Sequence, residues 1–314
     1  MAVAATGFFD GVHLGHRAVI ETLLRTARER SEQSLILTFW PHPRTVLRGG
    51  SRDLRLLTSL DEKIALLKGL GVDRIEVLPF TRDFSAMTAR EYLELLRRDY
   101  DVTSIVLGYD NRFGSDGLST EQIGELAQGM FITPEVVSPQ QICATLGTIR
   151  GGTAIAVGSS DSETICRGDT TSANISSTKI RKALGAGDVK LAAQMLGYEY
   201  SLSGVVVSGN MMGRTIGFPT ANMKLREPLK CLPGVGAYLS RVEVEGQQLW
   251  GMTNIDHNEK IETNIFDFSD EIYGLDLKVT FIDKLRDEIR FNSFEELKSQ
   301  LEKDRVAALQ IITG

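Results

Sequence analysis

The sequence contains little cysteine, and its three cysteines, Cys143, Cys166 and Cys231, are scattered along 314 residues. An odd number at such spacing does not form a disulfide framework, and it does not match the ligand spacing of a zinc site. We therefore expect a protein of a reducing compartment, located in the cytoplasm.

Long apolar runs and excess positive charge are also absent. No run approaches the roughly 18 apolar residues that a membrane-spanning helix needs, and the N-terminal MAVAATGFFDG lacks the charged start of a signal peptide. The formal net charge of −6 argues against broad binding of nucleic acid. We expect neither a membrane nor a nucleic-acid partner, so an anionic ligand must be held by local donors. Oligomeric state does not follow from these patterns.

The length of the chain favours two domains. In the first half, short apolar runs alternate with helical patterns, and the predicted order begins with a strand at 3–9 and a helix from Arg17. Strands that alternate with helices predict a parallel sheet covered on both faces. The loops at 7–16, 40–43 and 108–114 all follow predicted strands, so we expect them at the carboxyl edge of the sheet, where such folds bind ligands.

The loop GFFDGVHLGH contains two of the four histidines, His13 and His16. A helix N-terminus has free backbone N–H groups and attracts phosphate. Gly11 and Gly15 leave the backbone open to close approach, and the imidazoles add donors where charge develops in phosphoryl transfer. The alternative is a pair of structural histidines that complete a loop.

The stretch ISSTKIRKALGAGD begins with Ser176, Ser177 and Thr178, which favour a helix start, and continues with Lys179 and Arg181. Hydroxyls and cations at a helix start predict a second anion site, although solvated basic residues after a plain cap fit the pattern too. The preceding Gly-, Ser- and Thr-rich segment at 147–174 is long for a loop and is typical of a functional or disordered connection.

The second half changes class. Residues 188–200 are predicted to finish a helix, and short alternating runs separated by turns then predict an antiparallel barrel or sandwich. A final amphipathic helix is capped by Asn292 or Ser293. We predict its apolar face from five side chains: Phe294, Leu297, Leu301, Val306 and Leu309.

The stretch GRTIGFPTANM contains a stiff turn at Gly217 and Pro219. Thr220 and Asn222 supply hard oxygen atoms suited to a magnesium ion that carries ATP phosphates, and Arg214 suits a phosphate. An asparagine-capped turn is the alternative. Glu262 lies on an alternating run, where an outward-facing charge is common.

Several of these motifs resemble those of one family, in the same order along the chain. H-x-G-H turns mark the nucleotidylyltransferase superfamily, and GFFDGVHLGH closely resembles the prokaryotic bifunctional riboflavin kinase/FAD synthetases. TFWPHP, LGYDNRFG and ISSTKIRKAL resemble the second loop, the flavin-side glycine loop and the serine-rich signature of that family, and P-T-A-N resembles the riboflavin kinase signature. The resemblance covers nearly the whole chain.

The resemblance implies an α/β, Rossmann-like nucleotidylyltransferase domain with a parallel sheet at 1–187. An antiparallel β-barrel riboflavin kinase domain with a C-terminal helix would follow at 188–314. Its implied ligands are riboflavin, FMN, FAD and ATP, with Mg²⁺ as cofactor and ATP as co-substrate. The barrel would phosphorylate riboflavin to FMN, and the first domain would transfer AMP from ATP to FMN, which gives FAD and pyrophosphate.

The resemblance also implies roles for individual residues. The catalytic set is His13, His16 and Glu262, with Glu262 as the general base toward the ribityl hydroxyl. Thr220 and Asn222 would hold the metal, and the flavin-binding set is Asp110, Asn111, Arg112, Phe113 and Gly114. The ATP and phosphate set is Gly7, Phe9, Asp10, Gly11, Gly15, Ser176, Ser177, Thr178, Lys179, Arg181, Arg214, Gly217 and Pro219.

Three departures from the family pattern stand out. Phe8 replaces a small polar residue, which alters packing more than chemistry, and Asn264 replaces a histidine two residues after Glu262. The loop after Ile255 is short and lacks an Arg-Pro-Thr element. The departures in the second half motivate an alternative, an FAD synthetase with a degenerate kinase barrel. A flavin-binding regulatory protein is a third hypothesis, against which the intact H-x-G-H and P-T-A-N strings argue.

Overall fold

The computed structural model describes residues 1–47, 54–109, 112–137, 175–209, 213 and 217–313. The chain folds into two compact units, one formed by 1–54 and 58–176 and the other by 55–57 and 177–314. These units divide the chain after Ser176, and the domain limit at 187 stays a prediction.

The first unit is built on an open sheet in the order β3-β2-β1-β4-β5, in which every neighbouring pair is parallel. The strands are β1 (Ala2–Thr6), β2 (Gln33–Trp40), β3 (Arg74–Pro79), β4 (Val102–Gly108) and β5 (Thr133–Val137). All residues of the central strand β1 are buried, as expected for a parallel sheet that is covered on both sides. The predicted parallel sheet is therefore confirmed.

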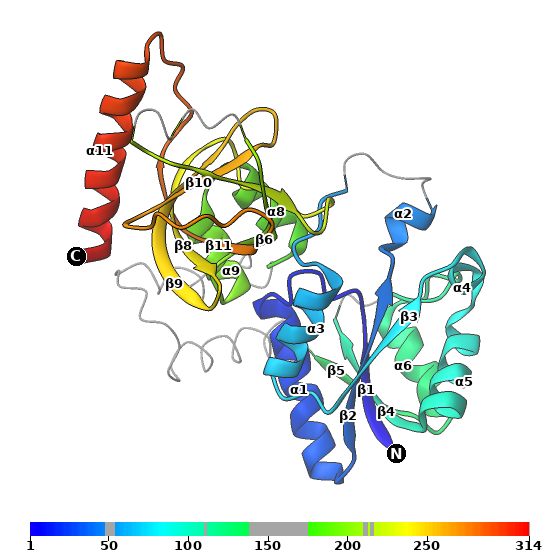
Figure 1. Ribbon diagram of the computed structural model, residues 1–314. Coiled ribbons are helices and arrows are strands. Elements are labelled where there is room, and N and C mark those ends of the chain that lie inside the picture. The colour runs from blue at the N-terminus through cyan, green and yellow to red at the C-terminus, as the bar shows by residue number, and fades with distance from the viewer. Residues whose placement is uncertain (48–53, 110–111, 138–174, 210–212, 214–216, 314) are drawn as a thin grey trace, which may run out of the picture. The chain divides into compact units, whose positions relative to one another are not determined.

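Helices cover both faces of this sheet (Figure 1). The helices described in this unit are α1 (Leu14–Arg30), α2 (Pro43–Leu47), α3 (Leu60–Gly69), α4 (Arg82–Ala86), α5 (Ala89–Tyr100) and α6 (Thr120–Gly129). Side chains of α1 and α3 form one hydrophobic core with Val3 and Ala5. Those of α5 and α6 form another with Ala2 and Ala4, because successive residues of a strand point to opposite faces.

The second unit is a closed barrel in the order β10-β7-β6-β11-β8-β9, and its strand pairs are antiparallel. Its strands are β6 (Ser201–Val207), β7 (Ala221–Leu225), β8 (Gly236–Val244), β9 (Gln247–Ile255), β10 (Ile261–Ile265) and β11 (Asp276–Arg286). Of the two architectures that the sequence left open, the barrel is the one that forms.

Helices α8 (Ser177–Gly185), α9 (Val189–Leu196) and α11 (Phe294–Thr313) accompany the barrel. Residues 188–200 do not finish a preceding helix as predicted. A separate helix, α9, begins there because the Asp188 carboxylate accepts a hydrogen bond from the Leu191 N–H at 2.9 Å. Asp188 is thus an N-cap that satisfies one free donor of the first turn.

The terminal helix α11 lies along the outside of the barrel (Figure 1). Its predicted cap is confirmed at Ser293, whose hydroxyl accepts from the Glu296 N–H at 3.1 Å. Its predicted apolar face is wrong in part, because the residues buried against the barrel are Asp304 and Ala308. Three members of the predicted face are exposed: Phe294 by 55%, Val306 by 55% and Leu309 by 41%. Across the described part of the chain, no helix combines the length and apolarity needed to cross a membrane.

Candidate active sites

The loop between β1 and α1 turns more sharply than the sequence predicts. Strand β1 ends at Thr6 rather than continuing to Phe9, because Phe9 and Val12 adopt φ of 51° and 38° and Gly11 adopts 82°, values outside the strand region. Helix α1 begins at Leu14, before the predicted Arg17. His16 therefore lies in the first turn of α1.

His13 is the N-cap of α1, a role that sequence preferences do not assign to histidine. Its Nδ1 accepts a hydrogen bond from the His16 N–H at 3.3 Å, so the ring proton of a neutral His13 is on Nε2. The two imidazoles are stacked, with centroids 3.6 Å apart and planes 14° apart. A Cβ on Gly15 would lie 3.3 Å from the His13 ring, so the glycine leaves room for the stacked pair.

His16 is the more perturbed of the two imidazoles. Its Nδ1 is buried and has no hydrogen-bond partner among the described residues. Burial, reinforced by the positive charges of His13 and Lys63, holds the pKa of His16 well below its ordinary value. Its imidazole is therefore neutral at physiological pH, and a neutral ring donates one hydrogen bond and accepts another.

Asp10 and Gly11 are tied to the start of α3. The Asp10 carboxylate accepts from the Thr58 N–H at 3.1 Å, and the Thr58 hydroxyl oxygen accepts from the Gly11 N–H at 3.1 Å. All three residues are buried. In this structure Asp10 and Gly11 hold the loop in shape, and Gly7 does the same by donating its N–H to the Leu37 carbonyl at 3.1 Å.

Lys63 is a member of this site that sequence reasoning missed. It lies on α3 and is 1% exposed. Its Nζ donates to the Phe8 carbonyl at 3.0 Å and to the Thr38 hydroxyl at 2.9 Å. The signal was present, because Lys63 shares helical phase with Leu67 and Leu70, which pack into the core. A lysine on an apolar stripe indicates a buried charge.

The loops after β2 and β4 bring aromatic residues toward the same edge. The His42 ring lies 4.2 Å from the Phe8 ring, so the unusual Phe8 packs against the second loop. The Phe113 ring lies 5.3 Å from Tyr92, whose hydroxyl is 2.7 Å from the Thr6 hydroxyl at the end of β1.

The rest of the predicted flavin set is only partly described. Asp110 and Asn111 lie outside the described residues, and Arg112 is exposed. Gly114 adopts φ of 86°, and a Cβ there would overlap the Ala89 backbone. The glycine thus allows the loop to approach the start of α5.

The serine-rich motif begins close to α1. A Cβ on Gly15 would lie 3.6 Å from the Ile175 carbonyl, and Ile175 packs against the core on that face of the sheet. Ser176 is the last residue of the first unit. The remaining members, Ser177, Thr178, Lys179 and Arg181, belong to α8 of the second unit, where Arg181 donates to the Arg55 carbonyl at 3.4 Å.

In the barrel, Glu262 on β10 lies between two asparagines. It is directly opposite Asn222 on β7 and directly opposite Asn254 on β9. Residues opposite each other in an antiparallel pair place their side chains on the same face. Lys260 forms an ion pair with Glu262. Sequence reasoning missed Asn254 as a neighbour of the carboxylate, because register does not follow from one sequence.

Asn222 has the properties of an oxygen ligand that lacks its partner. The residue is buried, and its Oδ1 has no hydrogen-bond partner among the described residues. A Cβ on Gly209 would overlap the Asn222 amide, so the neighbouring backbone approaches closely. A buried amide oxygen without a donor costs free energy, which fits a site that receives a cation with its phosphates. Arg214 lies outside the described residues.

Asn264 braces the turn that carries the P-T-A-N string. Its Nδ2 donates to the Pro219 carbonyl at 2.7 Å, and the residue is buried. Gly217 adopts φ of 83° in the same turn. Asn264, which replaces the histidine of the resembled family, thus supports the turn next to Thr220.

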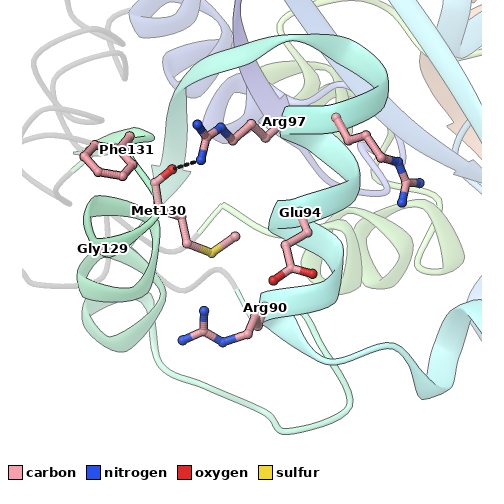
Figure 2. A pocket seen from close by; sticks show the side chains of 7 residues that line it. Arg90, Glu94, Arg97, Gly129, Met130 and Phe131 are labelled. Carbon is pink, nitrogen blue, oxygen red and sulfur yellow. Dashed lines mark hydrogen bonds between the residues drawn. The ribbon is translucent and has the colours of Figure 1, made fainter.

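A shallow pocket of about 540 Å³ lies between α5 and α6 of the first unit (Figure 2). It is lined by Arg90, Glu94, Arg97, Arg98, Gly129, Met130 and Phe131. Arg97 donates to the Met130 carbonyl at 3.1 Å. The pocket includes no predicted site residue.

The structure contains two separate groups of candidate site residues, one in each unit. One places imidazoles at a helix start beyond the central strand of a parallel sheet, where phosphate binds well. The other places a carboxylate opposite an amide on a barrel wall, and the oxygen of this amide has no hydrogen-bond partner among the described residues. Together they define a two-domain enzyme that transfers groups from nucleotides.

The comparisons with known proteins agree with this class. Residues 1–145 match the family model of FAD synthetase, and residues 196–312 match that of riboflavin kinase. The chain belongs to the family of bifunctional riboflavin kinase/FMN adenylyltransferases, and it is a transferase of flavin cofactor biosynthesis that carries both domains and uses ATP as co-substrate.

Curated relatives with that name match along the whole chain. The *Listeria monocytogenes* protein is 35% identical, with 96% of this chain and 90% of the relative covered. The *Bacillus subtilis* protein is 33% identical over 100% of this chain and 93% of the relative. The *Escherichia coli* K12 protein is 33% identical over 98% and 91%.

A solved structure shows the same fold. A crystal structure described as a macrolide-efflux protein from *Streptococcus pneumoniae* is 28% identical, with a TM-score of 0.78 and 98% of this chain and 93% of that chain covered.

Proposed function

We propose that each reaction takes place at the constellation described in its own domain. Riboflavin would be phosphorylated at the barrel wall around Glu262, and FMN would be adenylylated beyond β1, at the start of α1. The observation that carries the assignment is the direct opposition of Glu262 and Asn222. It places a proton acceptor beside an oxygen atom that has no hydrogen-bond partner among the described residues. This geometry supports a working kinase rather than a degenerate barrel or a regulator that only binds flavin.

Glu262 is the proposed general base of the kinase. Its carboxylate would take the proton of the riboflavin 5′-hydroxyl as that oxygen attacks the γ-phosphate of ATP, a step that needs hydrogen-bond distance between the two groups. The Lys260 ion pair orients the carboxylate. Asn254, on the other neighbouring strand, lies within the same row and is suited to orient the hydroxyl.

Thr220 and Asn222 are the residues that would hold Mg²⁺ with the ATP phosphates. Hydroxyl and amide oxygens are ligands that Mg²⁺ accepts, and it is usually bound with few protein ligands and several phosphate or water oxygens. When bound, Mg²⁺ neutralises charge on the transferred phosphoryl group. The Oδ1 of Asn222, which has no hydrogen-bond partner in the described part of the chain, supports this part of the proposal.

At the other site, His13 and His16 would stabilise the charge that develops on the α-phosphate of ATP as FMN attacks. Adenylyl transfer needs positioning and charge neutralisation more than covalent chemistry by the protein. His16 is neutral because its pKa is lowered, so it acts as a hydrogen-bond donor rather than as a fixed charge. The roles of Ser177, Thr178, Lys179 and Arg181 at the triphosphate, and of Phe113 at the flavin, stay predictions from the motifs.

The proposal is tested by incubating the purified full-length protein with riboflavin, ATP and Mg²⁺ and separating the flavins by chromatography. Formation of both FMN and FAD is expected. FAD formed only when FMN is supplied would indicate a degenerate kinase, and bound flavin without product would indicate a regulator. We also propose that the protein is cytoplasmic. Its recovery in the soluble fraction of fractionated cells would test this location.

A further inference from the structure

We infer that Lys63 is a positioning residue for adenylyl transfer, a buried cation that fixes the loop between β1 and α1 and attracts the ATP phosphates from beneath it. This inference rests on the proposed location of the transferase site. No motif of the sequence includes Lys63, and the observations that support this role are the contacts of its ammonium group.

The start of α3 directs Lys63 toward the loop. Ser59 and Glu62 form a capping box that fixes the first turn of α3, and Lys63 follows directly. The same turn presents Thr58, which holds Asp10 and Gly11. Two consecutive parts of the loop are therefore anchored to one helix start.

The ammonium group is fully engaged by the loop and its neighbour β2. Nζ donates to the Phe8 carbonyl at 3.0 Å and to the Thr38 hydroxyl at 2.9 Å, and it lies 4.2 Å from the centre of the Phe8 ring. The Thr38 hydroxyl in turn donates to the Phe8 carbonyl at 3.2 Å. These contacts match the three donors of a lysine, with the third directed to an aromatic face.

These contacts fix the orientation of one peptide group. In a planar trans peptide, the C=O and the following N–H point in opposite directions. Because the Phe8 carbonyl points to Lys63, the Phe9 N–H points away from it, across the loop. Lys63 therefore holds the Phe9 N–H in an orientation in which this donor faces the side of the loop away from Lys63.

The charge itself has no direct counterion in the described part of the chain. Among the described residues, no carboxylate oxygen lies within ion-pair distance of Lys63 Nζ. A buried cation without a paired anion is costly. An incoming polyphosphate would supply the missing negative charge, so the cost in the free protein is offset when ATP binds.

The surroundings of Lys63 set how it titrates. Burial lowers its pKa from 10.5 to about 8, against the opposing influence of Asp10. Among the described residues, the titratable groups that interact with it are Asp10 on the loop and His16 in the first turn of α1, while β2 contributes the non-ionising Thr38. Polyphosphate binds the protonated form more tightly, so by linkage ATP affinity falls as the pH rises above about 8.

The test follows FAD formation from FMN and ATP by the full-length protein between pH 6.5 and 9.5. In the wild type, KM for ATP is expected to rise above pH 8, by up to about tenfold per pH unit as linkage to one proton allows, until it approaches the KM of the neutral-lysine form. The change in kcat should be smaller. Lys63→Met should raise KM for ATP at pH 7 about tenfold or more and remove this pH dependence. Lys63→Arg, which keeps its charge, should restore low KM at pH 9.

Lys68→Met, at an exposed lysine of the same helix, is the matched control and should behave as the wild type. A wild-type KM that stays flat up to pH 9.5, or a Lys63→Met protein with wild-type KM and profile, would overturn the inference. If Lys63→Met does not fold, the wild-type profile and Lys63→Arg decide alone.

The His16→Ala protein distinguishes failure of the proposed transferase site from failure of the proposed role of Lys63. If His16→Ala loses FAD formation while Lys63→Met keeps wild-type kinetics, the proposed site stands and Lys63 has no role in it. Normal FAD formation in His16→Ala would place the reaction elsewhere and overturn the proposed site.

Discussion

Glu262 and Asn222 face each other across the β10–β7 pair of the closed barrel. They lie 40 positions apart in the sequence, and only the antiparallel register joins them. The relationship links two motifs that the sequence presents separately, one with a carboxylate and one with a turn rich in oxygen ligands. It makes the barrel wall a testable kinase site.

Glu262→Gln should lower FMN formation about 10²–10⁴-fold, the range for loss of a general base, and leave FAD formation from supplied FMN unchanged. The amide keeps the shape of the side chain and removes the proton acceptor. Separate rate measurements for the two reactions check this. Glu243→Gln, at an exposed glutamate of β8, is the control. Equal loss of both reactions in a folded Glu262→Gln protein would argue against two independent sites.

Asn222→Ala should raise the Mg²⁺ concentration needed for half-maximal FMN formation by about tenfold, on the scale seen when groups that support a metal site are removed. The reason is loss of the buried Oδ1 oxygen. Titration of Mg²⁺ at saturating ATP measures it, with Asn258→Ala in the exposed loop after β9 as the control. An unchanged Mg²⁺ requirement would remove Asn222 from the metal site.

His16→Ala should suppress FAD formation by about 10²–10³-fold, as expected when one stabilising donor is lost, and spare FMN formation. His257→Ala, at an exposed histidine of the second unit, should change neither rate. If FMN formation fell together with FAD formation, loss of folding would have to be tested by calorimetry before the result counted against the role of His16.

Lys63 predicts an unusual dependence of stability on pH. Its folded pKa of about 8 lies below the ordinary 10.5, so between these values the unfolded chain binds more protons and folding becomes more favourable as the pH rises. Relative to Lys63→Met, the wild type should gain about 3 kcal/mol of unfolding free energy between pH 8 and 10.5, since each pKa unit corresponds to about 1.4 kcal/mol. Urea unfolding of both proteins at several pH values measures it, and a constant difference would contradict the lowered pKa.

Asp304→Asn should destabilise the second unit by about 3 kcal/mol. The Asp304 carboxylate on α11 is buried and accepts from Arg286 Nε at 2.9 and 3.1 Å, and removing one charge of a buried pair leaves the other uncompensated. Asp267→Asn breaks an exposed pair with Arg305 and should cost less than about 1 kcal/mol. Urea unfolding compares the two variants, and similar losses would contradict the distinction.

The sequence predicted the architecture well because the period of its apolar residues changes between halves. Alternation of strands and helices led to the parallel sheet, and turn-separated short runs led to an antiparallel barrel or sandwich, of which the barrel is found. The loop containing His13 and His16 was located for the same reason, since a strand and a helix flank it.

The details that sequence missed depend on side chains in unusual roles. Helix α1 begins early because His13 uses its ring as a cap, which preference rules do not anticipate. Lys63 and Asp304 are charged residues that are buried, and no motif in the sequence singled them out. The neighbours of Glu262 required the strand register, which no local pattern fixes.

The open sheet of the first unit and the closed barrel of the second face different hazards of self-association. A closed barrel has no free strand edge, whereas the edge strands of the open sheet, within the described part of the chain, are β3 and β5. Strand β3 carries Arg74, Glu76 and Pro79, and β5 carries Pro134 and Glu135. Proline removes a hydrogen-bond donor, and charged side chains resist docking of another strand. Both of these edge strands are therefore protected against edge-to-edge aggregation. Uncharged substitutions there should lower the yield of non-aggregated protein before they lower enzyme turnover.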